Sequence, residues 1–180
     1  MRSLVLGLAA AALATQLSGC STLEGPGYYA QAVQGHLKLM ADARPVADWL
    51  QDPATPAPLR ERLALAQRIR AFAVSDLHLP DNPSYRRYAD LKRRSVVWNV
   101  VATPELSLQL QQWCFPVAGC VGYRGYYAEA DAQAFAQQLR AQGLDVSVYG
   151  VPAYSTLGWL NWLGGDPLLS TFLHYPEGEL

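Results

Sequence analysis

The sequence predicts an α+β protein, in which a helical N-terminal half packs on a small sheet with one crossover helix. Three observations predict this class. Apolar residues recur at three-to-four-residue spacing through much of residues 28–77. Runs rich in Val and Trp, typical of strands, begin at Ser95. One amphipathic helical segment, residues 129–142, lies between two of the later strands.

Length, composition and charge narrow the class of protein further. The chain has 180 residues, of which 51% are hydrophobic, enough for one domain with a sizeable core. Five Trp and ten Tyr argue against a disordered chain. The 14 basic and 15 acidic residues give a formal net charge of −1, so we expect no nucleic-acid partner.

The first 19 residues are typical of a secretion signal and not of a folded element. A positive start at Arg2 precedes an apolar run over residues 4–15, which is shorter than the roughly 20 residues of a membrane span. Leu17-Ser18-Gly19-Cys20 then matches a bacterial lipobox. We therefore predict a signal peptide over residues 1–19, lipidation of Cys20 and a tether over residues 20–27. An ordinary signal peptide with an incidental cysteine is the alternative.

The predicted lipid anchor indicates the cellular location of the protein. Several acyl chains on Cys20 would hold the chain stably on a membrane, because each buried CH₂ contributes roughly 0.8 kcal/mol. Ser21, where an aspartate would be a retention signal, favours the outer membrane over the inner one. We expect a lipid-anchored protein of the bacterial cell envelope that faces the periplasm.

The first half of the mature chain is expected to be helical. Helices are predicted from Tyr28 to Ala43, from Pro45 to Leu50 and from Pro58 to Leu77, the last two separated by a Pro-rich break. The third helix carries an apolar stripe that is expected to face the core: Leu59, Leu63, Ala66, Ile69, Ala73 and Leu77.

The second half is expected to hold four strands and the crossover helix. The strands are predicted at residues 95–103, 106–115, 121–127 and 144–151, the last from strict alternation of apolar side chains. The helix at residues 129–142 has acidic residues in its first turn, Arg140 in its last turn and Gly143 beyond its end. The whole of residues 28–180 is expected to form one α+β domain.

Cys114 and Cys120 frame a five-residue turn. In an oxidising compartment a disulfide that closes this turn is the simplest interpretation. Free thiols remain an alternative. A zinc pair is a weaker one, because zinc ligands are usually separated by two to four residues and no histidine lies nearby.

The histidines and the basic residues give only weak functional signals. None of the three histidines belongs to an H-x-x-x-H pair, and His174 with Glu177 is the one local pair with a carboxylate. A basic cluster spans residues 86–94 and is interleaved with tyrosines. It would suit anionic lipid or cell-wall polymer, although a solvated helical face is the simpler interpretation.

A run of motifs resembles the bacterial putative-aminopeptidase family of lipoproteins. The run consists of the Gly25-Pro26-Gly27-Tyr28-Tyr29 opening, Cys114-Phe115-Pro116-Val117-Ala118-Gly119-Cys120-Val121, Tyr123-Arg124-Gly125-Tyr126, Gly150-Val151-Pro152-Ala153-Tyr154-Ser155-Thr156-Leu157-Gly158-Trp159 and Asp166-Pro167-Leu168-Leu169-Ser170-Thr171. The resemblance implies a zincin-like fold, a peptide substrate cleaved at its N-terminus, and zinc held by an H-E-x-x-H helix.

Two departures from the family pattern set the expectations for this chain. Residues 161–165 look like a small insertion, and no H-E-x-x-H occurs in the 180 residues. We expect the chain to correspond to the N-terminal portion of the longer enzyme. It would lack the zinc-site half, bind no catalytic zinc and be inactive by itself. No catalytic or metal-ligating residue can then be assigned, and the oligomeric state and substrate specificity stay open.

The resemblance also suggests which residues face a substrate. In zincins an edge strand pairs with the extended peptide, and the strands at residues 123–127 or 146–151 are the candidates here. Tyr123 and Tyr126 belong to the first, and Tyr154, Ser155 and Thr156 lie in the aromatic loop after the second. Two alternatives remain, because that loop could be a packed connection and the protein could be a non-enzymatic lipoprotein that binds cell wall or partner proteins.

Overall fold

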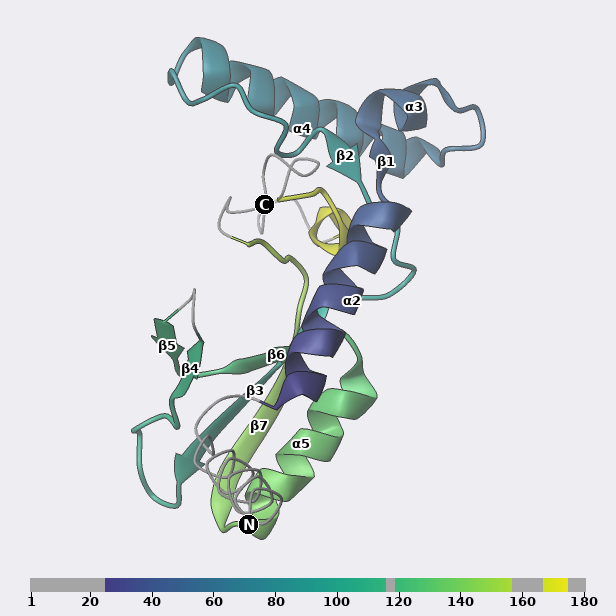
Figure 1. Ribbon diagram of the computed structural model, residues 1–180. Helices are drawn as coiled ribbons and strands as arrows, with labels where there is room; N and C mark the ends of the chain where they lie inside the picture. The colour runs from purple at the N-terminus through teal and green to yellow at the C-terminus, as the bar shows by residue number, and fades with distance from the viewer. Residues whose placement is uncertain (1–24, 116–118, 157–166, 175–180) are drawn as a thin grey trace, which may run out of the picture.

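Two lobes joined by one long helix make up the protein (Figure 1). The computed structural model describes residues 25–115, 119–156 and 167–174. The sheet lobe contains β3 (Val97–Pro104), β6 (Arg124–Tyr126), α5 (Glu129–Ala141) and β7 (Leu144–Val151). The helical lobe contains β1 (Arg44–Pro45), α3 (Val46–Gln51), α4 (Ala57–Ser75), β2 (Arg87–Tyr88) and the 3₁₀ helix η3 (Thr171–His174). Helix α2 (Pro26–Asp42) runs from one lobe to the other. The predicted α+β class is confirmed.

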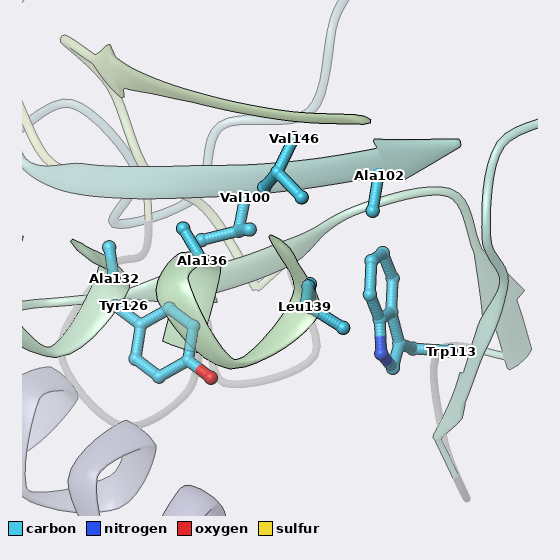
Figure 2. Packing of buried hydrophobic residues seen from close by; sticks show 8 residues of the cluster. All are labelled: Val100, Ala102, Trp113, Tyr126, Ala132, Ala136, Leu139 and Val146. Atoms are coloured by element: carbon cyan, nitrogen blue, oxygen red, sulfur yellow. The ribbon is translucent and has the colours of Figure 1, made fainter. Parts of the chain in front are cut away.

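The sheet lobe is a three-stranded antiparallel sheet with α5 across one face. The strand order is β6-β3-β7, so the crossover from β6 through α5 to β7 passes over the central strand β3. Figure 2 shows α5 facing the strands, with the rings of Tyr126 and Trp113 beside it. The buried cluster consists of Val100, Ala102, Trp113, Tyr126, Ala132, Ala136, Leu139 and Val146.

Small side chains let α5 lie close to the sheet. Ala132 and Ala136 are fully buried, and they sit four residues apart on the face that meets β3 and β7. Glu129 and Asp131 stand in the first turn, where the helix dipole favours acidic groups. Gly143 follows the helix with φ = +82°, a backbone conformation that favours glycine. The predicted helix and the predicted final strand are therefore confirmed.

The predicted disulfide is present in a small hairpin beside the sheet. Strands β4 (Trp113–Phe115) and β5 (Gly119–Val121) pair antiparallel, and Cys114 lies directly opposite Cys120. Their sulfur atoms are 2.00 Å apart. Pairing in register places the two side chains on the same face of the hairpin, so the bond closes the turn between them.

Polar side chains contribute much of the packing in the helical lobe. Of the 19 residues of α4 only Leu59 and Leu63 are buried. Arginines of this helix instead donate hydrogen bonds to loop carbonyls: Arg60 to Asp52 and Thr55, Arg62 to Leu173, and Arg70 to Asn82 and Ser84.

The junction between the lobes has its own core under α2. Leu39, Ala43, Val96, Val97 and Leu168 are among its buried members. Gly35 allows α2 to lie against the ring of Tyr127, because a Cβ at this position would come within 2.2 Å of that ring. The contact brings α2 against Tyr127, the residue that follows β6.

The predicted strand over residues 106–115 is wrong for most of its length. Only residues 113–115 are extended, as β4, and the side chains of Leu106 and Leu108 are fully exposed. The hydroxyl of Thr103 donates to the carbonyl of Ser107 at 2.8 Å and also lies 3.1 Å from that of Gln109, contacts that accompany a loop after Pro104. The predicted strand at 121–127 is likewise divided, since β5 and β6 belong to different sheets.

Two further predictions fail in the helical lobe. The apolar stripe of α4 is buried only in its first half, and the side chains of Ile69 and Leu77 are more than half exposed. The basic cluster at residues 86–94 is not a helical face, because Arg87 lies in β2 and residues 92–94 form a bend. Its arginines are partly structural: Arg87 donates to the carbonyls of Met40 and Ala43, and Arg93 to those of Val96 and Tyr127.

The predicted signal peptide, Cys20 and most of the tether lie outside the described residues, as does Glu177. None of the helices in the described part of the chain combines the length and the hydropathy that crossing a membrane requires.

Candidate functional site

A cleft of about 330 Å³ lies where α2 meets the open face of the sheet. Contributions come from α2, β3, both hairpin strands, β6 with the turn before it, and the loop after β7. We call it the aromatic cleft. It is lined by Tyr28, Ala32, Val97, Asn99, Phe115, Val121, Tyr123, Gly125, Tyr127, Ala153, Tyr154 and Ser155.

The floor of the cleft is the sheet face that α5 does not cover. Asn99 and Gly125 are direct cross-strand partners on β3 and β6. Because side chains alternate along a strand, both lie on the face opposite Val100 and Tyr126, which are buried beneath α5. Gly125 has no side chain, and a Cβ there would approach the Asn99 carboxamide oxygen to 3.4 Å. The carboxamide of Asn99 therefore stands in a shallow, open floor.

The wall of the cleft is formed by α2, which also closes one edge of the sheet. The Gln31 side chain accepts a hydrogen bond from the Tyr127 backbone N–H at 3.3 Å and donates to the Gly125 carbonyl at 3.4 Å. An amide that binds one N–H and one C=O of a strand imitates a neighbouring strand. Hence β6 cannot add an extended peptide at the positions that Gln31 occupies.

Ring contacts hold the rim in place. Tyr154 meets Tyr127 edge to face with centroids 5.3 Å apart, and His36 of α2 lies 6.0 Å from Tyr154. On the other side Tyr28 stacks on Phe115 at 5.6 Å. Such pairs contribute about 0.5–1.5 kcal/mol each beyond the burial of their area. The loop after β7 and the disulfide hairpin are thereby both tied to α2.

The described residues that line the cleft are uncharged. Their polar groups are tyrosine hydroxyls, the carboxamide of Asn99 and the hydroxyl of Ser155. Beside it, the guanidinium of Arg124 lies 4.1 Å from the ring of Tyr28 and 4.3 Å from that of Phe135. These two cation–π contacts turn the charge of Arg124 away from the cleft and toward the α5 side. Such a surface suits neutral hydrogen-bonding groups and apolar side chains.

Of the five residues that the sequence suggested as substrate contacts, the structure brings three together. Tyr123, Tyr154 and Ser155 line the cleft, and the Tyr123 side chain is 46% exposed. Tyr126 is corrected, because its ring is 6% exposed and packs under α5. Thr156 follows Ser155 but does not line the cleft.

Sequence reasoning missed the floor and the wall of the cleft. Asn99 carried a signal, since it interrupts the apolar run Val96-Val97-Trp98-Asn99-Val100-Val101. An amide within such a run is unusual unless its face of the sheet is open. Gln31 carried none, because its role depends on how α2 meets an edge strand almost a hundred residues later.

The described residues do not fit a zinc site. Nowhere in residues 25–115, 119–156 and 167–174 do three His, Cys, Asp or Glu side chains gather as metal ligands. Cys114 and Cys120 are oxidised, and His174 makes a 3.0 Å hydrogen bond with the buried hydroxyl of Tyr88. We therefore derive no chemical step through a metal from these residues.

Fold and cleft together define an α+β protein that offers a neutral, aromatic binding surface at a helix–sheet junction. A scan against protein-family models matches residues 27–180 to the family described as "Putative aminopeptidase". The match spans most of the chain, and the protein belongs to this family. No curated protein and no solved structure matches the chain.

Proposed function

We propose that the protein is an envelope-anchored member of the aminopeptidase family and that its aromatic cleft holds side chains of a peptide substrate. The observation that carries the proposal is the meeting of Tyr123, Tyr154 and Ser155, from two distant segments, in one cleft. The family match supports the same class of substrate.

The chemistry of the cleft supports a neutral section of peptide. The carboxamide of Asn99 offers both a donor and an acceptor, as a peptide backbone requires, and its N–H group also reaches the Tyr149 hydroxyl at 3.5 Å. The tyrosine rings offer flat apolar surfaces for side chains. None of the described residues that line the cleft has a carboxylate for a free α-amino group. We infer that the cleft contacts residues beyond the substrate's N-terminus and leaves recognition of the amine to other groups.

Substrate would be held by side chains and not by strand addition to β6, because Gln31 already occupies that edge. This departs from the zincin arrangement that the family resemblance implies for β6. The other sheet edge belongs to β7, with which no other described strand pairs. Strand addition, if the enzyme uses it, is therefore proposed for β7.

Zinc and the membrane anchor are also part of the proposal, and only the sequence resemblance supports them. The H-E-x-x-H helix that the resemblance implies for longer family members does not occur in these 180 residues; in those members it would supply two histidine ligands and a glutamate that activates water. Cys20, acylated, would tie residue 26 to the membrane through six residues, which reach at most about 20 Å. The cleft would then work close to the membrane surface.

Peptide binding to the full chain tests the proposal. The probe is a fluorescently labelled pentapeptide, Ala-Phe-Ala-Leu-Gly, titrated with wild type and with two matched variants. Tyr123→Ala removes a ring from the cleft, and Phe72→Ala removes an exposed ring far from it in sequence, on α4 of the helical lobe. We expect Tyr123→Ala to weaken binding about tenfold, the equivalent of 1.4 kcal/mol, and Phe72→Ala to leave it within twofold.

The remaining measurements distinguish the proposed function from its alternatives. Equal affinities for the two variants, or no binding by wild type, would refute the cleft as a peptide site. Release of N-terminal residues from the same peptide, with and without added zinc, reports enzymatic activity of the chain. Retention on purified cell-wall sacculi without any peptide binding would instead favour the non-enzymatic alternative.

A further inference from the structure

We propose that the loop after β3 enters the interfacial layer of a lipid bilayer and so forms a second contact between the protein and its membrane. The proposal rests on the membrane anchor of the proposed function. The loop covers residues 105–112, between β3 and β4, and projects from the sheet lobe (Figure 1). We call it the leucine loop. Its side chains Leu106 and Leu108 are 102% and 100% exposed, and Leu110 is 47% exposed.

The exposure of these leucines is unusual in its extent. Single exposed leucines are common on protein surfaces, but here three of them occur within five residues of one loop. A fully exposed side chain buries no area against its neighbours, so Leu106 and Leu108 add no hydrophobic stabilisation to the fold. Apolar side chains displayed in this way are expected where a protein meets another apolar surface.

Hydrogen bonds within the leucine loop satisfy part of its backbone. The N–H of Ser107 donates to the Pro104 carbonyl at 3.1 Å, and the N–H of Gln109 donates to the Ser107 hydroxyl at 3.1 Å. The Ser107 carbonyl accepts from the Thr103 hydroxyl at 2.8 Å. Backbone groups without partners are costly in lipid, so these bonds lower the cost of moving the loop from water into the interfacial layer.

The sequence around the leucine loop is almost free of charge. From Ser95 to Tyr123 there is one charged residue, Glu105. Charged side chains are the most costly groups to bring into a bilayer, so this composition suits a membrane surface. Exposed apolar side chains near the end of α4 lie instead among charged ones such as Arg68 and Asp76. The leucine loop is therefore the better candidate for contact with lipid.

The leucine loop is attached to the same hairpin as the start of α2. Tyr28, in the first turn of α2, stacks on Phe115 of β4 at 5.6 Å. The loop leads directly into β4, and Leu110 lies against Gly122 after β5, where a Cβ would come within 2.8 Å of the leucine side chain. An acylated Cys20 would reach the domain at the start of α2. The short tether would thus keep this hairpin, and the loop with it, at the membrane.

A bilayer suits this surface better than a protein partner does. Stable protein interfaces bury about 800 Å² on each partner and are enriched in aromatic residues and arginine. The leucine loop offers aliphatic side chains on one short segment, which is sufficient for interfacial entry because the acyl anchor would supply most of the affinity. Glu105 adds a negative charge, so we expect entry into neutral phosphatidylcholine that does not depend on anionic lipid or on salt.

Quenching by lipid tests the proposal. The full chain, with Leu108→Cys labelled by nitrobenzoxadiazole, is reconstituted in phosphatidylcholine vesicles. The other cysteines are closed to the label, because Cys114 and Cys120 form the disulfide and Cys20 would be acylated. Leu79→Cys, at a leucine that is 54% exposed in the helical lobe, is the matched control. We expect doxyl-labelled lipid to quench the label at position 108 about threefold more strongly than the label at position 79, in low and in high salt.

Removal of the neighbouring leucine tests the role of the side chains themselves. Leu106→Ser should reduce the quenching of the label at position 108 about twofold, because less apolar area would enter the lipid. Leu77→Ser, at a leucine that is 57% exposed in the helical lobe, should leave the quenching unchanged. Melting temperatures verify that both variants stay folded. Equal effects of the two changes would contradict the proposal.

The other outcomes separate this proposal from the anchor and from a protein partner. Equal quenching at positions 108 and 79 would overturn the membrane contact. Protection of the label at position 108 from aqueous iodide without quenching by lipid would assign the leucines to a protein surface, and so would also overturn it. A chain that floats with the vesicles while position 108 stays open to iodide contradicts the leucine loop alone. A chain that does not float contradicts the anchor as well.

Discussion

The two lobes each have a buried hydrophobic cluster, but the longest helix of each lobe packs in a different way. In the sheet lobe α5 buries small apolar side chains against the strands, and Ala132, Ala136 and Val100 are fully buried. In the helical lobe α4 buries two leucines near its start, and its remaining contacts are largely arginine-to-carbonyl bonds. A hydrophobic pattern in the sequence therefore describes the first lobe well and the second poorly. The following changes test this contrast.

The largest effect is expected within α4 itself. Leu63 is fully buried, so Leu63→Ala should lower the free energy of unfolding by about 2–5 kcal/mol. Ile69, six residues later on the same predicted stripe, is 55% exposed. Ile69→Ala should change stability by less than about 0.5 kcal/mol. Urea denaturation of both variants measures the difference. Equal losses would show that the whole stripe is buried, and so contradict the contrast.

The disulfide should give the next effect, confined to the sheet lobe. Replacing both Cys114 and Cys120 with serine removes a short covalent loop, which corresponds to about 2–3 kcal/mol in the chain-entropy description. Hydrogen exchange should then rise around β4 and β5 and stay unchanged in α4. A uniform rise over both lobes would mean that the hairpin stabilises the entire molecule.

The joint between the lobes is tested by its glycine. In Gly35→Ala the new methyl group would overlap the Tyr127 ring, so we expect a loss of about 1–3 kcal/mol and weaker peptide binding in the aromatic cleft. Gly27→Ala in the same helix has open space around it and serves as the control, with unchanged or slightly raised stability. If Gly35→Ala left the stability unchanged, α2 would not lie close to the ring of Tyr127.

The smallest effect concerns a surface ion pair network in the helical lobe. Hydrogen bonds from Arg70 and Arg86 hold the pKa of Asp81 below its ordinary value of 3.8. A lowered carboxyl pKa stabilises the fold above pH 4, and that stability is lost as the pH falls through the folded-state pKa. The melting temperatures of wild type and Asp81→Asn should differ slightly at pH 7 and converge below pH 3. A constant difference would exclude the charge as its cause.

Much of the fold could be predicted because its signals are local. Alternation gave β7 at Leu144–Val151, and Gly143 marked the end of α5. The segment at residues 106–112 misled, because its leucines alternate as in a strand, whereas the chain forms a loop that contacts Thr103. The exposure of the apolar residues of α4 beyond Ala66 could not be predicted either, because it depends on which other elements pack against that helix.

The site could also be predicted only in part, because some of its residues come together through contacts that are distant in the sequence. Tyr154 and Ser155 were found because they lie in an aromatic loop after a strand. Tyr126 was misassigned because the face on which a strand residue lies follows from register, which pairing with β3 decides.

Photo-crosslinking tests the central claim, that the aromatic cleft is the peptide site, most directly. A variant of the pentapeptide that carries benzoylphenylalanine in place of its phenylalanine is irradiated with the full chain, and adducts are mapped by mass spectrometry. The account predicts adducts on Tyr123, Tyr154 or their neighbours in the cleft, suppressed by excess unlabelled peptide. Competed adducts confined to the helical lobe would place the peptide elsewhere and contradict it.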